Sequence, residues 1–141
     1  MCYYGLIAYC ILAVPAATLA SEQPCNKPLR MKIATRWTIG PLRVQRIRGT
    51  AVDFNGVVIP GACILLFSES GHKFIASVES GKDGGFALSD VSPGAYRLVS
   101  RYDNFSVANA RVDVGRFSGR RALVVRMRPV GIDTGSYIEL R

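Results

Sequence analysis

The chain has 141 residues, of which 49% are hydrophobic, and its formal net charge is +8 at pH 7. A chain of this length and composition forms one domain with a core of its own, which excludes a disordered or fibrous protein. The positive charge is concentrated near the N-terminus. Seven basic and no acidic residues lie between Gln23 and Val52, whereas eleven basic residues face nine acidic ones after Val52.

Residues 1–20 are predicted to be a signal peptide. They are apolar throughout and end in small residues, with Thr18 and Ala20 at the −3 and −1 positions before Ser21. The usual basic residues at the start are missing, and an uncleaved anchor, a lipoprotein and a buried core helix remain as alternatives. Cleavage predicts an exported protein that is periplasmic or extracellular.

Residues 21–43 are predicted to be a basic linker followed by a strand. Between Leu29 and Trp37 apolar residues alternate with basic ones, which indicates a half-buried strand whose outer face carries Arg30, Lys32 and Arg36. This would be an extra N-terminal strand beside the main fold.

Residues 44–128 are predicted to form an all-β, antiparallel β-sandwich. Short apolar runs alternate with turn residues at regular intervals, which is typical of that class. We expect seven strands, at residues 43–52, 62–68, 72–79, 86–89, 95–102, 106–114 and 121–127. The strand at 62–68 is apolar on both faces, so it should be central and covered on both sides. Residues 129–141 form a tail that either adds an edge strand or frays.

The expected core lies between the two sheets of this sandwich. The residues expected to face it are Leu65, Phe74, Phe86, Tyr96, Leu98 and Leu123.

Four turn motifs in this region, taken in order, resemble those of the carboxypeptidase regulatory-like domain. They are Gly49-x-Ala51-x-Asp53-x-Asn55-Gly56, Ile59-Pro60-Gly61-Ala62, Lys82-Asp83-Gly84-Gly85-Phe86-x-Leu88 and Val91-x-Pro93-Gly94-x-Tyr96-x-Leu98. The resemblance implies a seven-strand, transthyretin-like (prealbumin-like) sandwich of immunoglobulin-like architecture, a fold also grouped with carbohydrate-binding-like domains. It further implies an accessory module without catalytic residues.

The chain offers little for catalysis or metal binding. His72 is its one histidine and follows a turn glycine, so it supports neither a catalytic triad nor a zinc site. Asp53, Asn55, Asp83 and Asp90 could be imagined as calcium ligands, but Asx side chains commonly cap their own turns and we expect that role. We therefore expect no enzyme, no metal and no cofactor.

Cys25 and Cys63 are the only cysteines outside the leader. An exported protein could join them in a disulfide. Cys63 could equally be a buried apolar residue of its strand, since free cysteine is often buried in this way. Both interpretations remain open at the level of sequence.

The basic residues Arg30, Lys32, Arg36, Arg46 and Arg48 are the candidate anion-binding site. They could attract an anionic glycan or a lipid head group, or they could be a solvated face that discourages edge-to-edge pairing. Nucleic acid is not expected, because few aromatic residues accompany the basic ones.

Together these features predict an exported, non-catalytic binding or accessory module for a saccharide or another envelope ligand. The alternative is a structural module that docks to a larger envelope protein through its basic strand or an open sheet edge.

Overall fold

The computed structural model describes residues 25, 40–70, 73–131 and 135–141, and in this part of the chain it is all-β. No helix long and apolar enough to cross a membrane occurs among these residues. The strands are β1 (Leu42–Val44), β2 (Ile47–Asp53), β3 (Cys63–Ser68), β4 (Phe74–Glu79), β5 (Gly85–Leu88), β6 (Gly94–Arg101), β7 (Ala108–Val114), β8 (Leu123–Met127) and β9 (Tyr137–Leu140).

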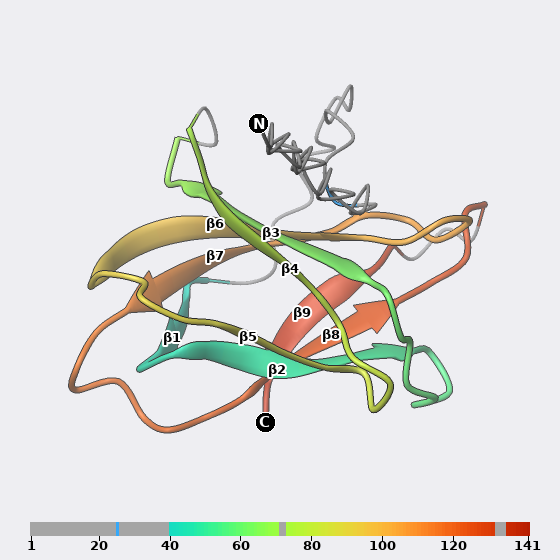
Figure 1. Cartoon of the computed structure of the whole chain (residues 1–141), viewed down its shortest axis with the longest axis horizontal. Coiled ribbons are helices and arrows are strands. Elements are labelled where there is room, and N and C mark those ends of the chain that lie inside the picture. Colours follow the sequence, from blue (N-terminus) through green and yellow to red (C-terminus); the bar gives the residue numbers. More distant parts are fainter. Residues whose placement is uncertain (1–24, 26–39, 71–72, 132–134) are drawn as a thin grey trace, which may run out of the picture.

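The strands form two sheets that pack face to face as a sandwich, seen edge-on in Figure 1. The five-stranded sheet has the order β1-β7-β6-β3-β4, and the four-stranded sheet has the order β5-β2-β8-β9. The sandwich is confirmed, but two sequence expectations need correction: the described residues form nine strands instead of seven, and the pairs β1–β7 and β2–β8 are parallel.

Both corrections have one main cause, the division of the strand expected at 43–52. Its first part, β1, pairs with β7, and its second part, β2, pairs with β8 in the other sheet. The chain changes sheets at Gln45 and Arg46, between the two strands. The strand expected at residues 29–37 lies outside the described residues.

The C-terminal tail adds an edge strand, which was one of the two expected outcomes. β9 pairs antiparallel with β8. Arg126 Nε on β8 donates to Glu139 Oε1 on β9 at 2.6 Å, and this hydrogen bond raises the pKa of Arg126. Before β9, the Ser136 backbone nitrogen donates to Ser106 Oγ at 2.9 Å, which ties the tail to the loop between β6 and β7.

The core fills the space between the sheets with aliphatic side chains and Phe86. Phe86, Leu98 and Leu123 are buried there, as the sequence predicted. Tyr96 packs against the core while half-buried, and its hydroxyl donates to the Ser92 carbonyl oxygen at 2.6 Å. The polar tip of this ring thereby fixes the turn that precedes β6.

The prediction for Leu65 was wrong in direction. Ile64 and Leu66 face the core, so Leu65 lies on the outer face of the five-stranded sheet. It is nevertheless buried there, together with Cys25, Cys63 and Val99. The expectation that this strand is covered on both faces is therefore confirmed, and β3 lies inside its sheet between β6 and the edge strand β4.

The prediction for Phe74 was also wrong, because β4 contains a bulge. Leu66 pairs with Ala76 but Phe67 pairs with Phe74, so Ile75 is an extra residue in the ladder. Phe74 thereby lies beside Phe67, with ring centroids 5.9 Å apart, and its exposed fraction is 54%.

Cys25 and Cys63 form a disulfide, with a Cα–Cα distance of 5.4 Å. Both residues are buried on the outer face of the five-stranded sheet. Of the two interpretations that the sequence left open, the bridged pair is the one the structure supports. The bond attaches the N-terminal segment to β3 at Cys25.

Candidate anion-binding site

An arginine-lined hollow of about 360 Å³ opens at the end of the sandwich where β1 leads into β2. We call it the arginine pocket, and its lining residues are Gln45, Arg46, Arg48, Arg120 and Arg121. Two segments that are far apart in the sequence contribute to it. The first surrounds the start of β2, and the second is the end of the loop that precedes β8.

The parallel pairing of β2 with β8 brings these segments together. Gly49 pairs with Leu123, so the residues immediately before each of them lie side by side. Arg48 Nη2 donates to the carbonyl oxygen of Arg120 at 3.3 Å, which links the two segments directly. The pocket is therefore a consequence of the sheet topology.

The local sequence directs the guanidinium groups outward. Ile47 is buried in the core, and side chains in a strand alternate between faces. Arg46 and Arg48, on either side of Ile47, are accordingly exposed. Arg120 and Arg121 are also exposed, which leaves the four groups facing solvent around the hollow.

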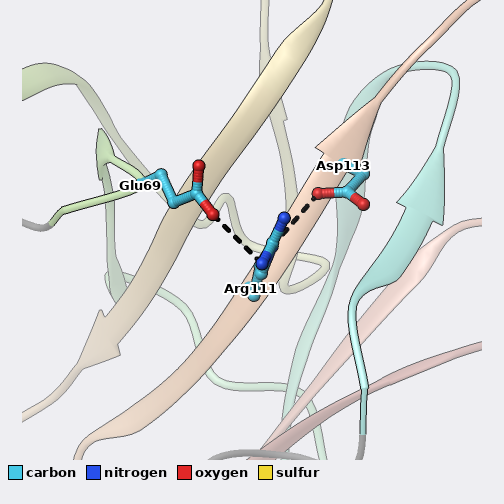
Figure 2. Close-up of polar contacts among 3 residues, drawn as sticks. All are labelled: Glu69, Arg111 and Asp113. Atoms are coloured by element: carbon cyan, nitrogen blue, oxygen red, sulfur yellow. Dashed lines mark hydrogen bonds and ion pairs between the residues drawn. The ribbon is translucent and has the colours of Figure 1, made fainter.

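Within the described residues, no carboxylate forms an ion pair with these four arginines. Arg111 on β7 differs from them, since Figure 2 shows its guanidinium group between two acids. Arg111 contacts Glu69 at 3.0 Å and Asp113 at 3.4 Å. Four unneutralised guanidinium groups around one hollow create a positive potential that favours an anion.

Guanidinium groups select a particular chemistry. Their planar, always charged forks match the oxygens of carboxylate, sulfate and phosphate groups in a bidentate way. A metal cation would be repelled by them. No group of three or more acidic, cysteine or histidine side chains that could hold a metal occurs in the described part of the chain.

Asp53 and Asp83 have the structural role that the sequence predicted for them. Asp53 Oδ1 accepts hydrogen bonds from the backbone nitrogens of Asn55 at 2.8 Å and Val57 at 2.9 Å. Asp83 Oδ1 accepts one from Gly85 at 2.9 Å. These carboxylates cap their own turns, as Asx side chains commonly do.

The structure brings together part of the predicted site and adds to it. Arg46 and Arg48 lie in the arginine pocket. Arg30, Lys32 and Arg36 lie outside the described residues, as does His72. Sequence reasoning missed Arg120 and Arg121, although they form a basic pair at the start of the strand predicted at 121–127; the missing information was the parallel pairing that places this strand next to β2.

A family model for the carboxypeptidase regulatory-like domain matches residues 46–128. The match runs from Arg46 in the pocket to the residue after β8, and it includes Arg120 and Arg121. The edge strands β1 and β9 lie outside it. No curated protein matches the chain.

Proposed function

The chain belongs to the carboxypeptidase regulatory-like domain family, and we propose that it acts as a non-catalytic binding module whose ligand presents an anionic group to the arginine pocket. The observation that carries this proposal is the convergence of Arg46, Arg48, Arg120 and Arg121 on one hollow, with no described carboxylate to neutralise them.

The proposed location of this module is outside the cytoplasm, in the periplasm or the extracellular space. Two features support that location. Residues 1–20 have the pattern of a signal peptide, and a disulfide persists mainly in oxidising compartments. The anionic ligands available in a cell envelope are acidic saccharides and lipid head groups, and an arginine pocket suits both.

The test is calorimetric titration with a sulfated oligosaccharide derived from heparin, with an uncharged dextran oligosaccharide for comparison. We expect the wild type to bind only the sulfated probe, and to bind it less tightly as salt rises, because exposed charges are screened. The variant Arg46→Gln/Arg48→Gln should lose about tenfold or more in affinity, since a hydrogen bond to a charged group contributes roughly 1.5–3 kcal/mol.

The matched control is Lys73→Gln/Lys82→Gln, which removes the same net charge from two exposed residues outside the pocket. It should bind the sulfated probe like the wild type. Both double variants should keep their unfolding free energy within about 0.5 kcal/mol, as surface substitutions usually do. Equal losses of affinity in the two variants would show that net charge, and not the pocket, attracts the probe.

A structural role as a docking module is the second candidate, and the edge strand β4 favours it. β4 pairs with β3 alone in the five-stranded sheet, and Phe74 and Ile75 on it are exposed. An open edge with apolar side chains can receive a strand of a partner protein. This role predicts that the sulfated probe binds neither the wild type nor the arginine variant.

A further inference from the structure

Phe117 is fully exposed, with an exposed fraction of 103%. It lies at the corner of a tight turn between β7 and β8, in which the Ser118 nitrogen donates to the Gly115 carbonyl oxygen at 3.2 Å. This geometry places Arg116 and Phe117 at the two central positions of the turn. The ring therefore projects from the end of the sandwich.

The loop that carries Phe117 is fixed at both of its ends. The Gly115 nitrogen donates to the Val44 carbonyl oxygen at 3.0 Å, which attaches the turn to β1. At the other end, Ala122 and Arg141 exchange backbone hydrogen bonds of 2.9 and 3.2 Å. Phe117 is thus presented by an anchored protrusion and does not belong to a frayed segment.

Arginines line two hollows at this end of the sandwich. The arginine pocket includes Arg120 and Arg121 from the same loop as Phe117, and a second hollow of about 370 Å³ is lined by Arg43, Arg116 and Phe117 among others. Asp113 is the acid in the second hollow, and its carboxylate already pairs with Arg111 at 3.4 Å. The exposed cations of this end include Arg43, Arg46, Arg48, Arg116, Arg120 and Arg121.

A soluble anion explains the arginines but gives no role to a fully exposed phenylalanine among them. The surface of an anionic bilayer explains both. Its phosphates attract guanidinium groups, while an aromatic ring at the same level enters the boundary between head groups and acyl chains. Single exposed apolar residues are common on proteins, but Phe117 lies in a turn at a cationic end of the molecule.

We propose that this end of the sandwich, with the exposed Phe117 and the six exposed arginines just named, docks on the surface of an anionic lipid bilayer. The proposal rests on the anion-binding function argued above and assigns the anionic group to a lipid phosphate. The sandwich would contact the membrane surface with this end and would not cross the bilayer.

Co-sedimentation of the full chain with vesicles tests the proposal at low salt. Vesicles of phosphatidylcholine alone should leave the protein in solution, and vesicles that also contain phosphatidylglycerol should sediment it. Phe117→Ser should lower the partition coefficient about tenfold, the loss expected when a phenylalanine no longer enters the apolar boundary. Arg120→Gln/Arg121→Gln should lower it by about fivefold for each arginine removed.

Phe74→Ser is the matched control, because it removes another exposed phenylalanine from a different part of the surface. It should sediment like the wild type, and Phe117→Leu should retain most of the binding. Phe117→Ser should also bind the sulfated oligosaccharide with unchanged affinity. A midpoint of thermal unfolding equal to that of the wild type shows that each variant is folded.

The outcomes separate this proposal from the function on which it rests. If Phe117→Ser sediments like the wild type, or if phosphatidylglycerol makes no difference, the membrane proposal is wrong, while pocket-dependent binding of the sulfated probe still stands. If Phe117→Ser loses the sulfated probe as well, Phe117 contacts a soluble ligand and the membrane proposal is again wrong. A wild type that binds neither probe overturns the anion-binding function itself.

Discussion

Gly49 lies opposite Leu123 in the parallel pair of β2 and β8. A Cβ atom at this position would clash with the carbonyl oxygen of Leu123. This oxygen belongs to the backbone of the paired strand, so it cannot rotate away as a flexible side chain could. Glycine in a strand interior often marks such a close approach. The same pairing brings Arg48 close to Arg120, whose carbonyl oxygen accepts a hydrogen bond from Arg48 Nη2.

Gly49→Ala should therefore destabilise the fold by about 1–3 kcal/mol, the range typical of an overpacked position. Gly119→Ala is the control, because the nearest atom to a Cβ there is Arg121 Cγ at 3.9 Å. The control should stay within about 0.5 kcal/mol of the wild type. Urea unfolding measures both, and a wild-type midpoint for Gly49→Ala would mean that β2 and β8 are not paired in this register.

For the strands, it was easier to predict which face of the sheet a residue occupies than which strand pairs with its own. Alternation along β6 and β8 correctly placed Leu98 and Leu123 in the core. The strand at 62–68 was correctly predicted to be covered on both faces. Because it is apolar throughout, however, its sequence does not show which residues face the core, and Leu65 was assigned to the wrong face. Phe74 was misplaced because a bulge reverses the alternation without a glycine or proline to signal it.

Two phenylalanines test these assignments. Phe86 is 6% exposed within the core, so Phe86→Ala should cost about 3–5 kcal/mol. Phe74 lies beyond the bulge on the outer face, and Phe74→Ala should cost less than about 1 kcal/mol. Chemical denaturation of the two variants gives the comparison. A larger loss at Phe74 than at Phe86 would place the bulge elsewhere in β4.

The candidate site shows where prediction from sequence ended. Composition located the excess charge near the N-terminus, and Arg46 and Arg48 were correctly singled out as exposed cations. Their partners Arg120 and Arg121 lie more than 70 residues away, as the separation of 72 residues between Arg48 and Arg120 shows. Period-two alternation carries no information about such a pairing, because it reports the face of a strand and not its neighbour.

The disulfide is a second long-range link, and the sequence left it open because the spacing of two cysteines does not reveal their distance in space. In the structure it fixes Cys25 to the outer face of the five-stranded sheet, where both cysteines pack with Leu65 and Val99. The bond closes a loop with a sequence separation of 38. In the chain-entropy model, a crosslink over that length stabilises the folded state by about 4 kcal/mol.

Cys25→Ala/Cys63→Ala should therefore unfold at a clearly lower denaturant concentration than the oxidised wild type, with a loss of about 4 kcal/mol in unfolding free energy. Addition of a reductant should bring the wild type close to the double variant and leave the double variant itself unchanged. Thiol titration of the denatured, unreduced wild type should detect neither Cys25 nor Cys63. If reductant does not change the stability of the wild type and both thiols react, the crosslink is absent. The proposed oxidising compartment would then be supported only by the signal-peptide pattern of residues 1–20.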